Sequence, residues 1–281
     1  MNRNLKYFAL LVIAVGLMAL SSVASAGTKF RYNYQEGTTL RYQVMINSKI
    51  KFEQLGSLAQ LLNLDNVSNN VEMYVDLNVI TVGSEGTALV NVEFSKISMV
   101  TVAGDSVFTD NGSNWGAIKP GSMYSIEINK NGEIMNDDQI DSLGGRQAVQ
   151  LVQRFFPQFP DSEIEPGYEW SDSLDFDLQM PGEKTTEIQS QMSYLYVNKI
   201  VGNGYQFDYQ ASGKSHDARK IDLQGDGNIN FDNKEGQLDE NSGNFQIDAL
   251  LELSSLGFPQ GLGTIPVHID SNIEIKLNNA E

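Results

Sequence analysis

The sequence predicts a mainly β (α+β) protein, built as a large curled antiparallel sheet or half-barrel meander with one or two helices on its concave face. Two patterns favour this class: long segments in which apolar and polar residues alternate, and glycine-rich turns between them. The clearest alternating segment is Leu40 to Phe52, where apolar residues take almost every second position. At roughly 3.3 Å per residue this strand would span about 43 Å, so it needs equally long partners in a sheet that twists and curls.

Met1 to Ala26 has the features of a secretory signal peptide. Arg3 and Lys6 precede an apolar run from Phe8 to Leu20, and Ala24-Ser25-Ala26 fits the small-x-small cleavage rule. The apolar run is short for a bilayer span, so we expect cleavage after Ala26 rather than a retained anchor. The chain has no cysteine, which excludes a lipidated cysteine at the cleavage site and all disulfides. We therefore expect an exported protein, periplasmic or extracellular, that does not span the membrane after signal cleavage.

Charge and length limit the classes of partner and the number of domains. The formal net charge is −17 at pH 7, which disfavours nucleic acid and anionic lipid head groups as partners. Removing the leader leaves about 255 residues, enough for one large β domain or two small ones. We expect one β-rich domain over residues 27–281, with two similar halves meeting near 157–170 as the alternative. That alternative rests on two similar turns, at Asn131-Gly132 and at Lys234-Glu235-Gly236, although general turn chemistry also explains them.

The first half of the mature chain reads as a three-stranded meander with an inserted helix. A short aromatic strand is expected at Phe30 to Tyr34, before the long strand. Leucines at helical spacing predict a short amphipathic helix over Glu53 to Asn66, placed either as a lid over the sheet or as a plug at the core edge. Alternation predicts a second long strand over Val71 to Val79. A third strand begins at Ala88, and its apolar residues change phase between Phe94 and Ile97, which indicates a β-bulge.

The remaining chain reads as loops, one hairpin, one good helix and more strands. Residues 103–120 form a loop with a brief strand at Val107-Phe108, and Tyr124 to Asn136 is a hairpin turning at Asn131-Gly132. A helix capped by Asp141 or Ser142 runs to about Phe156 and is ended by Pro157. A Pro/Gly-rich connection then extends to Trp170. Further strands are expected at 173–180, 185–201, 204–212, 221–231, 237–253 and 267–277.

The chain contains no pattern that predicts catalysis. His216 stands among Lys214, Ser215 and Asp217, but adjacent residues project in different directions, so this is an exposed loop rather than a triad. His268 alternates with the apolar residues Val267 and Ile269, so its side chain is expected on the solvent-facing side of its strand. Phosphate-binding loops, dinucleotide-binding glycine patterns and nucleophile elbows are absent from the sequence. We therefore predict a protein that is not an enzyme, with no catalytic residues and no cofactor.

Two further groups of residues leave alternatives open. Two histidines and no cysteine make a transition-metal site unexpected, so no metal ligand is predicted. The acidic run Asp222 to Glu240 is rich in oxygen ligands for calcium, but Phe231 stands where an EF-hand loop requires glycine, and turn chemistry explains the same composition. Trp115 and Trp170 either stack on sugar rings or anchor the edge of the core.

Several short motifs carry a family resemblance. They are Phe156-Pro157-x-Phe159-Pro160, Gly167-Tyr168-x-Trp170, Gly225-x-Gly227 and Phe231-Asp232-x-x-x-Gly236-x-Leu238. In this order the chain resembles secreted bacterial β-rich proteins of unknown function. Its general shape is similar to the periplasmic lipoprotein-carrier (Lol-type) superfamily, a resemblance that implies a curled antiparallel sheet wrapped around helices and an apolar cavity.

These observations favour non-enzymatic binding of a hydrophobic ligand, lipid or lipidated partner on the concave apolar face. The expected lining residues alternate along the three long strands: Tyr42, Val44, Ile46, Met73, Val75, Leu77, Val90 and Val92. The alternative is a structural or interaction module of the cell envelope that binds protein or glycan through its acidic outer face.

Overall fold

The structure is a computed structural model dominated by one antiparallel sheet. It describes residues 27–56, 64, 66–112, 118–136, 143–174, 176–178, 186–202, 204–215, 217, 219–256, 259, 261 and 263–278. The expected leader, most of the expected helix over Glu53 to Asn66, His216 and Trp115 lie outside these residues. The described residues 53–56 are not helical.

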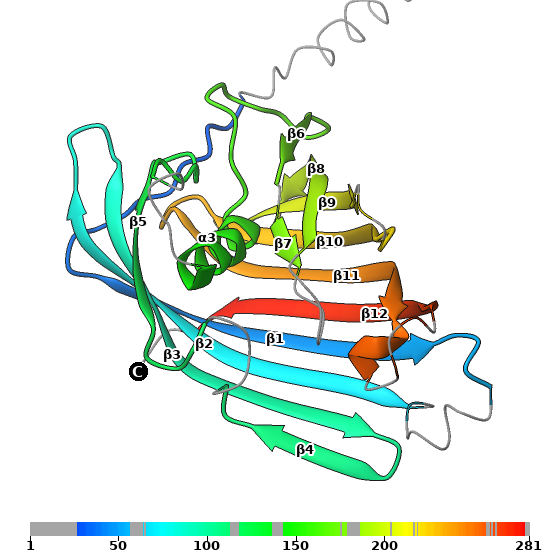
Figure 1. Ribbon diagram of the computed structural model, residues 1–281. Helices are drawn as coiled ribbons and strands as arrows, with labels where there is room; N and C mark the ends of the chain where they lie inside the picture. Colours follow the sequence, from blue (N-terminus) through cyan, green and yellow to red (C-terminus); the bar gives the residue numbers. More distant parts are fainter. Residues whose placement is uncertain are drawn as a thin grey trace, which may run out of the picture.

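The sheet is a single large antiparallel sheet that is not closed into a barrel (Figure 1), as the alternation predicted. Its strand order is β4-β3-β2-β1-β12-β11-β10-β9-β8-β6, with β5 paired to β3 and β7 paired to β8. The strands are β1 Thr39–Phe52, β2 Val67–Val82, β3 Ala88–Ala103, β4 Ser106–Asp110, β5 Met123–Ile128, β6 Glu169–Ser173, β7 Phe176–Leu178, β8 Thr186–Lys199, β9 Gly204–Lys214, β10 Asp222–Asp232, β11 Gln237–Glu252 and β12 Thr264–Leu277. The helical elements are α3 Leu143–Phe155 and the short 3₁₀ helix η2 Leu253–Leu256.

The first and last strands in chain order, β1 and β12, are neighbours in the middle of this sheet. From β1 the chain runs outward through β2 and β3 to one edge at β4 and β5. It then crosses by way of α3 to the opposite edge at β6, and returns strand by strand to β12. There β12 pairs antiparallel with β1, placing Val44 opposite Ile275 and Ile50 opposite Ile269. The strands that come first and last along the chain are therefore held together by one long ladder of backbone hydrogen bonds, while the edges of the sheet stay unpaired with each other.

The face of the sheet that carries α3, here called the inner face, is built from rows of side chains that run across the strands. One such row is buried from β3 through β1 and β12 to β8: Ile97, Met73, Val44, Ile275, Asn241, Ile229, Phe207 and Tyr196. The expected β-bulge is confirmed, because Tyr74 pairs with Lys96 while Val75 pairs with Phe94, leaving Ser95 extra. The bulge lets Phe94 and Ile97 both point into the core.

Two pieces of chain cover this part of the inner face. In α3, Ala148, Val149 and Val152 form a buried stripe, and Phe156 just beyond the helix meets Tyr42 edge-on, with ring centroids 6.0 Å apart. The second piece is the segment 30–34. Because it crosses the inside of the curl instead of joining the ladder, the expected strand at Phe30 to Tyr34 is wrong.

Two glycine turns hold the segment 30–34 in place. The Tyr32 N–H donates to the Lys130 carbonyl at 2.8 Å, and the Asn33 N–H donates to the Gly236 carbonyl at 3.0 Å. The turns at Asn131-Gly132 and Lys234-Glu235-Gly236, whose sequences are similar, thus contact the same segment. Both are real turns, with φ of +94° at Gly132 and +65° at Gly236, although after Gly132 the hairpin continues only as an isolated bridge between Ile128 and Ile134.

Most of the other expected elements are present. The helix after Ser142, the strand at Val107-Phe108 and the second-half strands from β8 onward are confirmed with small shifts of their ends. Of the strand expected at 173–180, the described residues show only the short β7. One difference is β6, which begins inside the stretch that was expected to be only a Pro/Gly-rich connection and ends where the next strand was expected to begin. It forms because Trp170 pairs with Tyr194 on β8 and stacks against its ring.

Replacing Gly236 with alanine is expected to destabilise the protein more than the same change at Gly37. Both glycines have positive φ, +65° and +78° respectively, so alanine costs about 1–2 kcal/mol of backbone energy at either position. At Gly236 the new Cβ would also collide with the backbone nitrogen of Asn33, whereas Gly37 faces open space. We expect about 1–3 kcal/mol of additional loss for Gly236→Ala, measured by urea denaturation of both variants. Equal losses would show that the turn does not press on the segment 30–34.

Candidate ligand-binding surfaces

The structure brings the expected lining residues together on the inner face, but most of them are covered by the protein itself. All except Ile46 are buried within the core: Tyr42, Val44, Met73, Val75, Leu77, Val90 and Val92. Between Leu77 and Val90 on the sheet and Val152 and Phe156 above them there remains a cavity of about 10 Å³, roughly the space of one water molecule. A role of these residues in ligand binding stays a prediction.

Further along the strands, three neighbouring rows of the inner face contain half-buried side chains, although the first row also includes the buried residues Val71 and Gly243. We call these rows the inner band. Its members come from β1, β2, β3, β11 and β12 and are paired across the strands: Met99, Ile46 and Ile273 in the first row, Thr101, Asn69, Ser48, Ser271 and Phe245 in the second, and Val67, Ile50, Ile269 and Ile247 in the third. Ile46 is the expected lining residue that belongs to this band.

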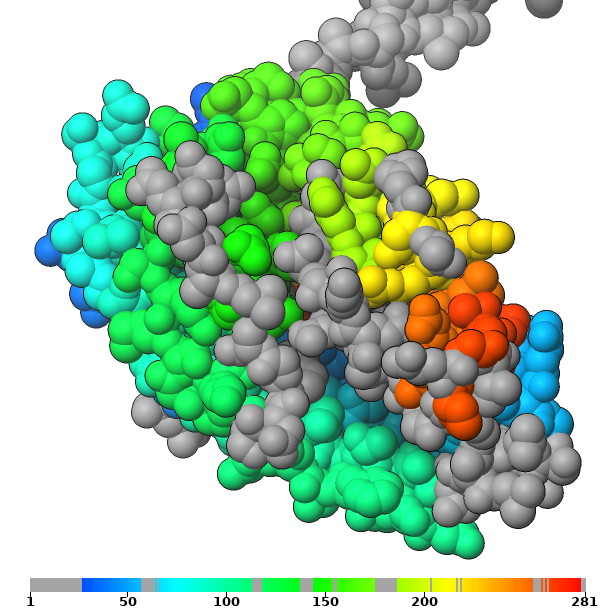
Figure 2. Space-filling view, in the orientation of Figure 1, coloured from blue at the N-terminus to red at the C-terminus, as the bar shows by residue number. Residues whose placement is uncertain are grey.

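The inner band lies between two buried parts of the same face. On one side is the buried row through Val44, and on the other Val267, Ala249 and Leu251 are again buried. Figure 2 looks towards this side of the molecule, where blue and cyan atoms of the first strands are seen deep between other elements. The band is therefore a partly accessible stretch of the inner face between two buried parts.

The middle row of the inner band is polar and its groups satisfy one another. The hydroxyls of Ser48 and Ser271 lie 2.8 Å apart across the β1–β12 pair. The Thr101 hydroxyl donates to Asn69 Oδ1 at 3.3 Å. This row continues to Phe108 on β4, which pairs with Thr101 and is 60% exposed. The band thus offers apolar contact on both sides of a narrow hydroxyl-bearing stripe, and it reaches the β4 edge of the sheet.

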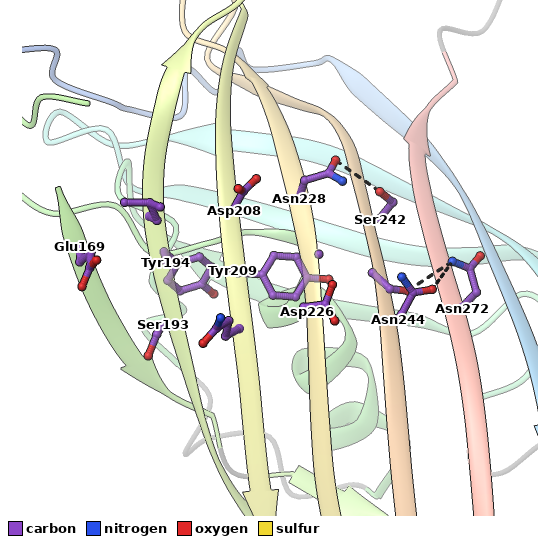
Figure 3. Close-up of a pocket in the computed structure, with 14 residues that line it drawn as sticks. Glu169, Ser193, Tyr194, Asp208, Tyr209, Asp226, Asn228, Ser242, Asn244 and Asn272 are labelled. Carbon is purple, nitrogen blue, oxygen red and sulfur yellow. Dashed lines mark hydrogen bonds between the residues drawn. The ribbon is translucent and has the colours of Figure 1, made fainter. Parts of the chain in front are cut away.

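The opposite face of the sheet, here called the outer face, carries a polar hollow of about 530 Å³. We call it the outer hollow; Figure 3 shows the side chains that form it. Strands β6 and β8 to β12 contribute the lining: Glu169, Ser193, Tyr194, Leu195, Asp208, Tyr209, Gln210, Asp226, Gly227, Asn228, Ser242, Gly243, Asn244 and Asn272. This volume falls within the range of small-molecule sites, about 300–1,000 Å³.

A pair of glycines accounts for the hollow. Gly227 and Gly243 face each other on β10 and β11, at positions whose side chains would point to the inner face. A Cβ on either residue would collide with the hydroxyl of Tyr209, so the two strands approach this ring more closely than any other residue type permits. The backbone of the same two glycines lines the outer hollow on the opposite face.

The outer hollow is rich in hydrogen-bonding groups and has no cation in its lining. The Ser242 hydroxyl donates to Asn228 Oδ1 at 3.3 Å, and Asn272 Nδ2 donates to Asn244 Oδ1 at 3.1 Å. The carboxylates come from Glu169, Asp208 and Asp226. A second hollow of about 480 Å³ adjoins it and shares Ser193, Gln210, Asp226 and Asn244. The alternation of the sequence predicted a polar outer face but contained no signal for a hollow, because the hollow depends on which glycines pair.

His268 lies on the outer face, as its parity predicted, between two carboxylates. Its Nδ1 is 2.7 Å from Asp248 Oδ1 and its Nε2 is 3.0 Å from Asp270 Oδ1. The hydrogen bond to Asp248 is the main cause that raises the pKa of His268 above its ordinary value of about 6.5, and burial opposes it. Both ring nitrogens are occupied by structural partners, which is the environment of a charged surface histidine rather than of a catalytic base.

The tryptophan and the acidic run have structural roles. Trp170 Nε1 donates to the Gln158 carbonyl at 2.8 Å, and its ring is stacked on Tyr194 with centroids 5.1 Å apart, so it anchors the edge of the core. Residues 222–240 form β10, β11 and the turn between them, where Asp232 Oδ1 accepts the N–H groups of Lys234 and Glu235.

The part of the chain that the structure describes contains neither a metal-binding cluster nor a membrane-spanning helix. In these residues no three His, Asp or Glu side chains gather closely enough to hold a metal ion. Helices with the length and apolar character needed to cross a bilayer are also missing from the described ranges.

Comparisons with known proteins do not assign this chain to a family or a function. No family model matches the chain, and no curated protein matches it. A solved structure that reports lipid–protein interactions in lipovitellin is similar with a TM-score of 0.49 and 12% identity, over 88% of this chain but only 26% of lipovitellin. DynF from the dynemicin biosynthesis pathway of Micromonospora chersina is similar with a TM-score of 0.25 and 7% identity, over 92% of this chain and 88% of DynF. Likenesses at these scores carry no ligand over to this chain. They give no evidence for the lipoprotein-carrier superfamily, which stays a prediction.

Replacing His268 with glutamine is expected to destabilise the protein at low pH and not at high pH. The folded-state pKa of His268 is raised, so its stabilisation is fully present below the unfolded pKa of about 6.5 and is lost as the pH rises through the folded value. The effect should stay below about 1 kcal/mol, because solvent screens the exposed Asp248. The measurements are urea denaturation between pH 5 and 9 and an NMR titration of the His268 ring, whose pKa should fall in Asp248→Asn. A stability difference that grows with pH would contradict this assignment.

Proposed function

We propose that the protein binds a hydrophobic ligand, a lipid or a lipidated partner along the inner band, without catalysing a reaction. The observation that supports this proposal is the group of half-buried apolar side chains that lies between the buried row through Val44 and the buried residues Val267 and Ala249. The band's isoleucines keep part of their apolar surface in contact with water. Covering that surface with a ligand would stabilise the complex by about 25 cal/mol for each Å² removed from water. An apolar ligand chain lying across β1, β12 and β11 would cover this surface and gain that stabilisation.

The site lies on strands that are paired over most of their length. The β1–β12 ladder runs from Tyr42 opposite Leu277 to Phe52 opposite Val267, and the band crosses the middle of this ladder. A ligand would therefore meet a rigid floor and would not have to order the backbone before binding. The absence of titratable groups among the described residues of the band supports binding without acid or base chemistry.

Export of the mature protein is part of the proposal and is tested separately. The leader Met1 to Ala26 should be removed. The exported protein should therefore have the intact mass of a chain that begins at Gly27. Recovery of the full-length chain from the cell membrane would contradict export as a free protein.

Two substitutions in the band test the binding proposal. Ile46→Gln and Ile273→Gln keep the side chain long but place an amide on opposite partners of the β1–β12 pair. We expect each to weaken binding of the fluorescent fatty acid 11-(dansylamino)undecanoic acid by about tenfold, since one buried amide costs about 1–3 kcal/mol. Ile80→Gln is the matched control, because Ile80 is an exposed isoleucine of β2 that lies outside the band.

The outcomes separate the proposal from its rival. Circular dichroism and thermal unfolding confirm that each variant is folded before binding is measured. If the wild-type protein binds neither the dansyl fatty acid nor any co-purifying lipid, the proposal is wrong and a structural or interaction module is the better description. Equal weakening by all three variants would place binding outside the inner band.

A further inference from the structure

The polar side chains of the outer hollow are aligned in rows across the strands. One row of outer-face side chains crosses five strands in register: Ser193, Gln210, Asp226, Asn244 and Asn272. A second row beside it contains Asp208, Asn228 and Ser242. Neighbouring strands lie about 4.8 Å apart, so the first row presents hydrogen-bonding groups over about 19 Å. The hollow is therefore an elongated groove with polar groups at regular intervals.

Several of these groups are available to a ligand. In the described part of the chain, the side chains of Ser193, Gln210 and Asp226 have no hydrogen-bond partner, whereas Asn244 and Asn228 are oriented by Asn272 and Ser242. Amides and hydroxyls both donate and accept. A ligand hydroxyl also does both, so a groove of this composition matches a chain of hydroxyl groups along its length.

The charges of the lining narrow the class of ligand. The groove contains carboxylates from Glu169, Asp208 and Asp226 and no lysine or arginine, which disfavours phosphates and acidic polymers. These carboxylates stand among amides and do not gather with a third acidic or histidine side chain to hold a metal ion, within the residues that the structure describes. Carboxylates spaced in this way accept hydrogen bonds from hydroxyls rather than enclose a point cation.

We propose that the outer hollow is a second binding site, for a neutral hydroxyl-rich ligand of the oligosaccharide class. It lies on the opposite face of the sheet from the inner band and does not depend on the function proposed for that band. The floor is backbone, supplied by Gly227 and Gly243 above Tyr209, so a ligand can approach the strands closely. Recognition depends on amides and hydroxyls that the ladder of the sheet holds at fixed spacing.

The test uses an array of neutral oligosaccharides, followed by titration calorimetry of the full mature chain with the strongest array ligand and, in parallel, with hexalysine. Asn244→Leu removes the central amide of the row and should weaken oligosaccharide binding at least tenfold. Asp226→Asn keeps the hydrogen-bonding shape and removes one charge, so it should change the affinity less than threefold. Asn70→Leu is the matched control: Asn70 is exposed on the same face, two strands beyond Asn272, and lies outside the lining.

Each outcome decides the assignment. Tenfold weakening by Asn244→Leu alone, with all variants showing the same melting temperature as wild type, supports it. No binding to any neutral oligosaccharide, or equal weakening by Asn70→Leu, overturns it. Binding of hexalysine that is lost in Asp226→Asn, without oligosaccharide binding, would assign the hollow to a basic peptide and would also overturn it.

Discussion

The packing of Phe30 inside the curl of the sheet is the contact on which the rest of the structure depends. Its ring lies 4.9–5.5 Å from the rings of Tyr205, Phe207, Tyr196 and Phe159, and 6.3 Å from that of Phe231. Each aromatic pair of this kind contributes about 0.5–1.5 kcal/mol beyond the burial of its area. The cluster joins a segment that precedes β1 to strands from the far half of the sheet and to the connection after α3. An open sheet of this size has no closing ladder of hydrogen bonds, so this cluster, with α3, maintains its curvature.

One sheet supplies two surfaces of different chemistry because successive side chains point to opposite faces, and β11 and β12 contribute to both. Around Val44 the inner face is filled by the protein, and around Ile46, Ser48 and Ile50 it is left half-open. On the outer face a polar groove lies over β6 and β8 to β12. The glycines connect the two faces: the ring of Tyr209 lies against Gly227 and Gly243 on the inside, and the groove lies above the same residues on the outside. A change in how one face packs would therefore alter the shape of the other.

The elements that could be predicted are those whose signal is local. The alternation of Leu40 to Phe52, the change of phase between Phe94 and Ile97, and the apolar stripe of Ala148 and Val152 each specify a local conformation, and all three are confirmed. The segment 30–34 has the composition of a strand but finds no neighbouring edge, because Phe30 and Tyr32 gain more by entering the aromatic cluster. Strand β6 was missed for the reverse reason, since the pairing of Trp170 with Tyr194 is distant in sequence.

By itself, the sequence determined the mainly β class, the two faces of each long strand and the turn positions of the glycines. These properties depend on the period of the side chains and on backbone sterics, which act between near neighbours. Only the tertiary structure decided that Val44 and its neighbours would be covered, that Ile46 would stay half-open, and that Gly227 would face Gly243. These outcomes depend on the register between distant strands and on which segment covers a face, and alternation along one strand contains no information about either.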